Sequence, residues 1–518
     1  MSLPSVTRVD TPNSRCLFAI AWADITPPVG IYHRMWGAAK HDRATGVHRP
    51  LRATVAVFAP LEEQDEPAIP ASATAEAEAS PYPRRSEEHA GGAAGFPPAA
   101  RVQVLLALDH CVLGAVEHDQ LVSQIAEISG QPRGAILVVF SHTHAAGLMG
   151  LERTSLPGGD LIPGYLRRVA EQCGELVREC VAKRAAASIV YGQGCCDLAA
   201  HRDYYDEEQG RFVCGFTPGA PADDTVLVAR VTDNRGVLLA TVVNYACHPT
   251  TLAWDNTLIS PDYVGAMREI VEQETGAPCL FLQGASGDLG PREGYLGDVA
   301  VADRNGGQLG HAALAALTAL PAPHTRFCYG GPVVSGATLG TWIHESLSAE
   351  DARQTLLWDI RRWKESLPYR PGRPSRAQVE GELRQLQDEE SEARAAGDAG
   401  REAESRAMAE RKRRLLHRLS QLPSGGVFPL QVVLWRLGDA LWLGVQGESY
   451  SLLQTELRRR VPGIPIIVAS VAADWGASYL PPMGIYDKGI YQESIAVVAA
   501  GSLEQLIESI ATQMAAVL

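Results

Sequence analysis

Residues 135–144 read AILVVFSHTH, a short apolar run that ends in two histidines separated by one residue. The run has the length and the β-branched content of a buried strand. Polar residues that directly follow a strand are held by a rigid element yet open to a cleft. In extended backbone, residues i and i+2 point to the same face, so we expect His142 and His144 to converge on one small volume. The alternative is a purely structural role, with two hydrogen-bonded histidines at the end of a strand.

Further apolar runs also end in groups that can bind a cation or orient a ligand. They are residues 236–249 with His248, 279–288 with Asp288, 430–449 with Glu448, and 464–475, which Tyr479 follows. Asp288 can orient an imidazole, and it can equally cap a turn. Cys247 should point away from the face that His248 uses, which favours a structural thiol. Two imidazoles with oxygen ligands fit zinc better than other divalent ions.

The order of elements indicates an α/β fold of the mixed α+β kind. Strand-like runs alternate with segments of helical period, at residues 118–129, 165–184, 263–274 and 501–518. Such alternation is typical of a large sheet covered by helices. We expect one catalytic domain built from residues 1–347 and 423–518.

Two segments differ in composition from this core. Residues 61–100 are rich in Ala, Glu, Pro and Gly, which predicts a flexible surface insertion. Residues 348–422 form a second inserted block, dense in Glu, Arg, Gln, Ala and Leu from Ser375 onward. Ser375 as an N-cap and a turn at 397–400 predict two long antiparallel helices. The composition favours a solvated helical hairpin, and the alternatives are a lid or a contact in a homo-oligomer.

Bulk composition excludes several classes of protein. The chain has 518 residues, 46% of them hydrophobic, and a formal net charge of -14. This acidity argues against the clustered basic face that nucleic-acid binding needs. No apolar run reaches about 18 residues, and the start of the chain lacks the pattern of a secretory signal. With ten scattered cysteines, typical of reduced thiols, the expectation is a cytoplasmic protein with a small-molecule substrate and no integral membrane segment.

Seven short segments follow one another in a recognisable order. They read ADITPPVG (23–30), TGVHRPLRA (45–53), SHTHAAG (141–147), NYACHPTTL (244–252), QGASGDLGP (283–291), QGES (446–449) and ASYLPPMGIYDKGIYQES (477–494). In this order they resemble the neutral/alkaline non-lysosomal ceramidase family. The resemblance leaves out residues 61–100 and 348–422. It implies a ceramidase-like catalytic core and a zinc-dependent hydrolase.

The resemblance also implies roles for individual residues. It implies a zinc ion held by His142, His248, Glu448 and Tyr479. It places His144 beside the metal as a hydrogen-bonding or proton-transfer group. Arg202, in AAHRDYY (199–205), falls where the family has an arginine that helps to bind the scissile group. Asp288 completes the set of catalytic candidates.

The chain departs from the family pattern in two places. Gly290 stands where the family carries a serine that has been assigned as catalytic, so a serine mechanism at that position is excluded. Ser286 is nearby but does not align with it. The chain also ends at Leu518 without the C-terminal β-sandwich domain of the secreted ceramidases. Together with the missing secretory signal, this favours a soluble substrate over membrane ceramide.

The resulting hypothesis is a hydrolase in which metal-activated water attacks a carbonyl, with an N-acyl amide as the expected bond. A metal lowers the pKa of its water from 15.7 toward about 7. His144 would transfer the proton, and Arg202 would stabilise the developing oxyanion. An ester, a lactone or a carbohydrate-derived metabolite is the alternative substrate. An inactive scaffold that assembles through the helical hairpin is the alternative of another class. A long apolar channel would favour an acyl chain, and a short polar cup would favour a metabolite.

Overall fold

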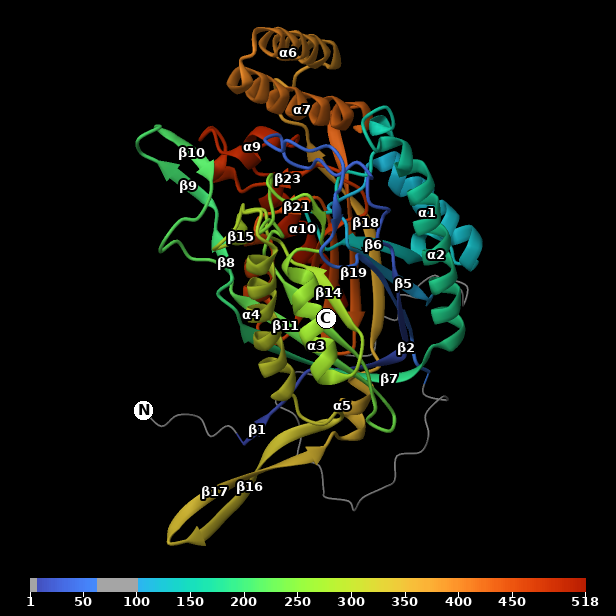
Figure 1. The fold of residues 1–518 in the computed structure, drawn as a ribbon. Coiled ribbons are helices and arrows are strands. Elements are labelled where there is room, and N and C mark those ends of the chain that lie inside the picture. Colours follow the sequence, from blue (N-terminus) through green and yellow to red (C-terminus); the bar gives the residue numbers. More distant parts are fainter. Residues whose placement is uncertain (1–6, 63–100) are drawn as a thin grey trace.

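The computed structural model describes residues 7–62 and 101–518 (Figure 1). Strands and helices alternate along the chain, and the fold class is mixed α/β, as predicted. Most of the predicted flexible insertion, residues 63–100, lies outside the described residues. In the described part of the chain, no helix combines the length and the apolar character that a bilayer crossing needs.

Within the described residues, twelve strands form one mixed sheet. In spatial order they are β14 (Cys279–Gln283), β12 (Leu238–Tyr245), β11 (Thr225–Asp233), β7 (Ala185–Cys195), β2 (Asn13–Asp24), β4 (Arg52–Ala59), β5 (Gln103–Leu108), β6 (Ile136–Phe140), β22 (Ile466–Ala472), β20 (Ala440–Gln446), β19 (Val427–Leu437) and β18 (Trp358–Pro368). The pairs β12–β14, β5–β6 and β20–β22 are parallel. The long apolar runs of the sequence are these strands, since most of them are buried on both faces.

The sheet curls so that its two halves pack against each other. One buried cluster consists of strand residues and includes Phe58 of β4 and Trp442 of β20, whose rings are 5.3 Å apart. Asn244 of β12 bridges to Val468 of β22, because its Nδ2 donates to the Val468 carbonyl at 2.8 Å and its Oδ1 accepts from the Val468 amide at 3.2 Å. These bonds satisfy a buried amide side chain. The curl therefore brings β12 close to β22, although the two strands are far apart in the sequence.

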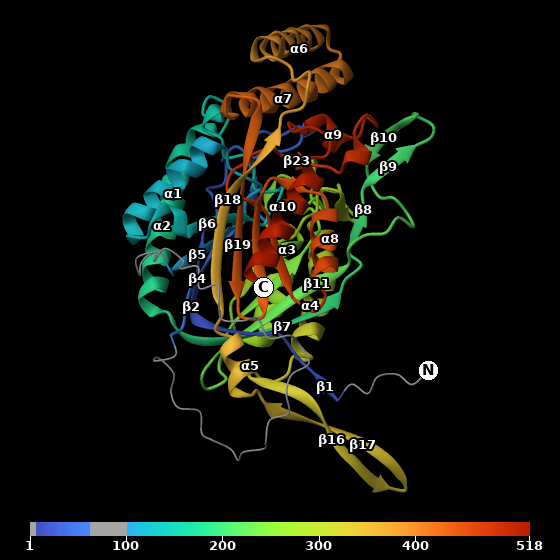
Figure 2. The ribbon, with the colours of Figure 1, turned by 180° about the vertical axis from the view of Figure 1, so that it is seen from behind.

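Helices cover the outward faces of the sheet in three groups (Figures 1 and 2). These are α1 (Ala115–Ser129) with α2 (Ile162–Lys183), α3 (Tyr263–Thr275) with α4 (Val299–Thr318), and α8 (Leu452–Arg460) with α10 (Ser502–Val517). Each group buries its apolar side in a separate cluster with the strands beneath it. This one-sided burial is typical of amphipathic helices on a sheet.

Short strand pairs and turns build the loops beyond the sheet. The pairs are β3 (Gly46–Val47) with β13 (Leu258–Ile259), β8 (Ala199–His201) with β15 (Leu289–Pro291), β9 (Asp203–Asp206) with β10 (Arg211–Cys214), and β21 (Glu448–Ser449) with β23 (Tyr479–Leu480). The short helices are η3 (Arg133–Ala135), η4 (Leu151–Arg153), η5 (Gly159–Leu161), η6 (Met483–Ile485) and α9 (Tyr491–Ile495). Several of these pairs position the candidate site residues described below.

The helical hairpin is present but shorter than the predicted block 348–422. It consists of α6 (Arg376–Ala396) and α7 (Ala399–Gln421); Ser375 Oγ caps α6, and Gly397 ends it with a φ of 71°. The block's first part instead contains α5 (Ala349–Gln354) and β18, which pairs with β19 over its whole length. The prediction that residues 348–374 belong to the helical hairpin was therefore wrong. Strand β18 lies at the edge of the sheet, and its many charged side chains are not typical of a buried strand.

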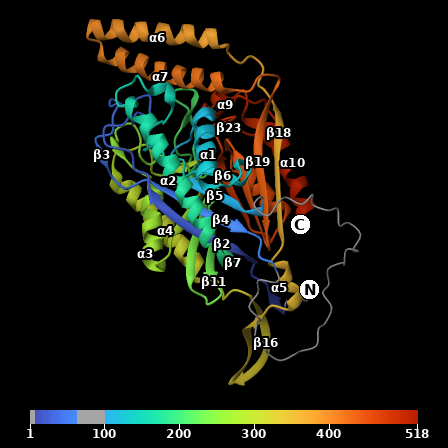
Figure 3. The same ribbon diagram turned by 90° about the vertical axis from the view of Figure 1, so that its right-hand side faces the viewer.

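The hairpin and a long β-ribbon lie at opposite ends of the molecule (Figures 1 and 3). The ribbon is a three-stranded sheet of β1 (Arg8–Val9), β16 (Thr325–Ser335) and β17 (Ala337–Ser346). The hairpin end is also the end at which β23 and α9 lie. The candidate site residues gather at this end.

Candidate metal centre

Four segments that are distant in the sequence bring the four predicted ligands together. His142 follows β6, and His248 follows β12. Glu448 and Tyr479 begin β21 and β23, which pair in register with each other at these two residues. All four side chains are buried.

The ligand atoms form a compact cluster. His142 Nε2 and His248 Nε2 are 3.0 Å apart. Glu448 Oε2 lies 3.3 Å from each of these two nitrogens. The hydroxyl oxygen of Tyr479 lies 3.3 Å from His248 Nε2. The spacing of the two imidazoles and the carboxylate is that of a group able to hold a metal ion.

Backbone carbonyls fix the orientation of both imidazoles. His142 Nδ1 lies 2.7 Å from the carbonyl oxygen of Cys111, and His248 Nδ1 lies 2.8 Å from that of Ser286. A carbonyl oxygen only accepts hydrogen bonds, so each Nδ1 carries a proton. In their neutral forms, both rings then direct an Nε2 lone pair at the other ring and at the Glu448 carboxylate. Such a cluster needs a positive charge at its centre, and the donor set of two imidazoles with oxygen ligands suits zinc.

Titration of these groups follows from burial and from their neighbours. Burial and the nearby Arg202 lower the pKa of His248 to about 3. Burial also lowers the pKa of His142, but Cys111 and Glu448 outweigh it and raise that pKa well above its usual value. Imidazole nitrogens bind a metal in their deprotonated form, so a cation bound here would compete with protons for these ligands.

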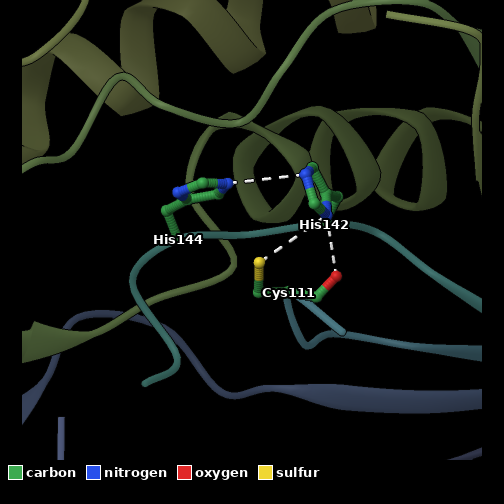
Figure 4. A group of neighbouring side chains, drawn as sticks. All are labelled: Cys111, His142 and His144. Atoms are coloured by element: carbon green, nitrogen blue, oxygen red, sulfur yellow. Dashed lines mark hydrogen bonds between the residues drawn. The ribbon is translucent and has the colours of Figure 1, made fainter. Parts of the chain in front are cut away.

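His144 lies beside His142 (Figure 4). Its Nε2 is 3.5 Å from His142 Nε2, and the two ring planes stand at 86°. The predicted convergence is present, but the predicted extended backbone is not, because His142 has a φ of 67°. This left-handed residue starts a tight turn that brings the two rings together. Burial and the neighbouring imidazoles hold the pKa of His144 well below its usual value, so the ring is neutral near neutral pH.

Arg202 contacts the cluster through Tyr479. It follows β8 and is only 3% exposed, so it is not a surface arginine. Its Nη2 donates to the hydroxyl oxygen of Tyr479 at 3.1 Å and to the carbonyl oxygen of Gly287 at 2.7 Å. No carboxylate among the described residues forms a salt bridge with it. Arg202 thus places a positive charge and hydrogen-bond donors next to Tyr479.

A cavity of about 620 Å³ opens onto this cluster. Its lining includes His142, His144, Arg202, Glu448 and Tyr479. Helix α7 forms another wall, with the apolar Met408 and Leu415 beside several charged side chains. Helix α7 of the hairpin therefore lies against the cavity, and the lid stays a prediction. The cavity is neither a purely apolar channel nor a purely polar cup.

Comparison with solved structures identifies the architecture. It is similar to a neutral ceramidase from Pseudomonas aeruginosa, with a TM-score of 0.59 and 15% identity over 98% of this chain and 74% of that chain. It is also similar to a ceramidase complexed with C2, with a TM-score of 0.60 and 14% identity over 98% of this chain and 75% of that one. The chain has a neutral ceramidase-like fold. No family model and no curated protein matches the sequence.

In this neutral ceramidase-like chain, Asp288 does not lie in the cavity wall. Its carboxylate accepts hydrogen bonds from the amide and the hydroxyl of Ser451, both at 2.6 Å, at the start of α8. This contact joins the 283–291 turn to the start of α8. No hydrogen bond between Asp288 and either imidazole is found among the described residues, and its catalytic role stays a prediction.

Gly290 lies in β15 beside Arg202 and Thr250. A β-carbon at Gly290 would lie 3.6 Å from Arg202 Cδ and 3.8 Å from Thr250 Oγ1, which are ordinary contacts. A β-carbon therefore fits at Gly290 without a close contact.

Sequence reasoning missed several residues of the site. Ser286, whose Oγ lies 3.3 Å from His248 Nδ1, and the cavity-lining Tyr491 were inside recognised motifs but had no assigned role. Trp36 packs against the His144 ring at 5.3 Å, and Arg418 of α7 lines the cavity. Nothing in the local sequence signals these last two residues, because their positions depend on how distant segments dock.

Proposed function

We propose that the protein is a zinc-dependent hydrolase that cleaves an N-acyl amide in a soluble substrate. The observation that carries the proposal is the cluster in which two buried Nε2 atoms and the Glu448 carboxylate lie within 3.3 Å of one another. His142, His248, Glu448 and Tyr479 would hold the ion. The likeness to ceramidase structures supports an amide as the bond.

Zinc bound there would act as a Lewis acid and make water a nucleophile near neutral pH. The residues of the chain supply the other parts of the reaction. His144 is neutral and faces the cavity, so its ring can take up a proton and deliver it to the leaving nitrogen. Arg202 directs its guanidinium at Tyr479, where it would stabilise negative charge that develops on the carbonyl oxygen.

Tyr479 would contribute its hydroxyl oxygen, which lies 3.3 Å from His248 Nε2, to the ion. Burial and the nearby Glu448 raise the pKa of its hydroxyl well above the usual value, although Arg202 opposes this effect. Helix α7 covers the cavity and would limit the access of bulk water to the reacting bond.

Matched substrates test the bond class. Zinc-reconstituted protein is incubated with N-acyl amides and with esters and lactones of the same acyl chain, and products are measured by mass spectrometry. We expect amide cleavage that a chelator abolishes and that added zinc restores. Cleavage of esters or lactones alone would move the proposal to the alternative substrate class. Activity that survives complete metal removal would contradict the metal-dependent mechanism, and no cleavage at all would favour the inactive scaffold.

A further inference from the structure

Helix α7 places a buried arginine in the cavity wall. Arg418 is 6% exposed, and its guanidinium lies over the Trp475 ring, with Cζ 4.5 Å from the ring centroid. Its Nη1 donates to the carbonyl oxygen of Ile495 at 3.1 Å. Its Nε is buried and has no hydrogen-bond partner among the described residues. A buried guanidinium without an anionic partner is unfavourable, so its presence in a cavity points to an anion that binds there.

The rest of the cavity wall is also cationic. Among the described residues, the charged groups of the lining are Arg202, Arg411, Lys412, Arg414, Arg418, Glu410 and Glu448. Neither carboxylate is available to Arg418, because Glu410 pairs with Arg153, Arg413 and Arg414, and Glu448 pairs with the two imidazoles. In a chain of net charge -14, this cavity is a local positive region that would attract an anionic substrate.

We propose that the site takes a substrate that carries a carboxylate, and that Arg418 binds this carboxylate. Arg418 forms no salt bridge among the described residues, and the paired N–H donors of a guanidinium match the two oxygens of a carboxylate. Met408, Leu415 and Trp475 supply apolar surface in the same wall. The substrate class is therefore an amide with an apolar portion and an acidic end, such as an N-acyl amino acid.

This inference rests on the proposed function for the identity of the site, and it adds the chemical class of the substrate. It assigns specificity to the hairpin, because Arg418 belongs to α7. The apolar residues of α7 that face the cavity would contact the substrate body, while Arg418 would select for its charge.

Binding of two matched probes tests the inference without requiring turnover. The affinities of N-hexanoylglycine and its neutral amide, N-hexanoylglycinamide, are measured by calorimetry with zinc-loaded protein at constant ionic strength. We expect the acid to bind at least about tenfold more tightly than the amide. Arg418→Gln should abolish this preference. Arg384→Gln should keep it, since Arg384 is an exposed residue of the outer helix α6 and its substitution removes the same charge.

Further variants separate the remaining explanations. His248→Ala should keep the preference for the acid, because the carboxylate is bound by Arg418 and not by the metal. If Arg418→Gln fails to fold, Arg418→Lys keeps the charge but loses the planar fork, and it should weaken acid binding and leave amide binding unchanged. Equal affinities for the two probes, a preference that Arg418→Gln retains, or no binding of either probe at about 10 mM would overturn the inference.

The outcome distinguishes this inference from the proposed function. A preference for the acid that depends on Arg418, without amide cleavage, would support the inference and contradict the proposed function. Cleavage of the neutral amide with no preference for the acid would support the proposed function and overturn the inference.

Discussion

At the scale of single residues, two backbone carbonyls determine how the candidate centre works. The carbonyl oxygens of Cys111 and Ser286 hold the Nδ1 protons of His142 and His248, so the two Nε2 atoms remain for a metal. Ser286 Oγ accepts a hydrogen bond from Gln283 Nε2 at 2.7 Å, which steadies the turn behind His248. The serine of the QGASG motif thus supports an imidazole.

His144 provides the first prediction at this scale. Because it lies beside the ligand cluster, His144→Gln should retain zinc and lose turnover by about 10²–10⁴-fold. The measurement is the turnover number together with the zinc content of the same preparation. Loss of zinc in this variant would show instead that His144 is a ligand. His311→Gln on α4 is a suitable control, since that histidine is exposed.

Gly290 provides the second prediction at the residue scale. The space beside Arg202 and Thr250 accepts a side chain, so Gly290→Ser should change the free energy of unfolding by no more than about 0.5 kcal/mol. The added hydroxyl would lie close to the cavity-lining Arg202 and Thr250, so the ratio kcat/KM should change. Urea denaturation and steady-state kinetics measure the two effects. A strongly destabilised variant would contradict the assigned space.

The sequence could predict the ligand residues but only part of their geometry. Histidines and acidic residues after apolar runs are visible locally, and the structure brings His142, His248 and Glu448 together. The left-handed backbone at His142 could not be predicted, because residues other than glycine rarely adopt it and the surrounding fold imposes it. Arg418 had no signal, since an arginine in a charged helix is typical of a solvated face.

At the scale of elements, a buried ion cluster holds α7 over the cavity. Glu410 is 1% exposed and lies 3.0 Å from Arg153 Nη1, 2.7 Å from Arg413 Nη1 and 2.9 Å from Arg414 Nε. At the C-terminal end of α7, Gln421 Oε1 accepts a hydrogen bond from the amide of Ala115, the first residue of α1, at 2.6 Å. These contacts, together with the ion pair of Arg406 with Asp42 and the bond from Arg418 to the Ile495 carbonyl, dock the hairpin on the rest of the chain.

Glu410 gives a prediction with a defined pH dependence. Burial raises the pKa of Glu410, but the three arginines outweigh it and lower the pKa from 4.5 to about 2. The pKa of Glu410 is lower in the folded state than in the unfolded state. The stabilisation is therefore fully present above pH 4.5 and is lost as the pH falls toward 2. Glu410→Gln should lower the free energy of unfolding by about 3 kcal/mol at neutral pH.

Urea denaturation from neutral pH down to about pH 3 measures this effect. The difference between wild type and Glu410→Gln should shrink as the solution becomes acidic. A difference that is constant over the range would contradict the ion cluster. Hydrogen exchange of residues 399–421 should increase in the variant, because α7 loses its main contact with Arg153.

Elements differ in how readily the sequence predicts them. The helices α6 and α7 could be predicted because Ser375 and Gly397 mark their ends. The edge strand β18 could not, because its run of charged residues has the composition of the adjoining helices. Which helix of the hairpin faces the core, and where it docks, depends on Arg153 and other residues more than 200 positions away.

At the scale of the whole molecule, the curled sheet places the candidate ligands. The four candidate ligands, His142, His248, Glu448 and Tyr479, come from four separate segments. The hydrogen bonds between Asn244 and Val468 join β12, which His248 follows, to β22, which Tyr479 follows. A metal at this point would join both halves of the sheet. Zinc should therefore raise the melting temperature of the wild type, and the increase should grow with free zinc concentration. A melting temperature that does not depend on zinc would contradict this linkage.

The most direct test of the account is the zinc content of the purified protein, measured by elemental analysis. The wild type and the control His311→Gln should each hold about one zinc ion per chain. His248→Ala and Glu448→Ala should hold almost none while remaining folded. A wild type that binds no zinc even after reconstitution, or variants that bind it as the wild type does, would contradict the central claim that these residues form a metal centre.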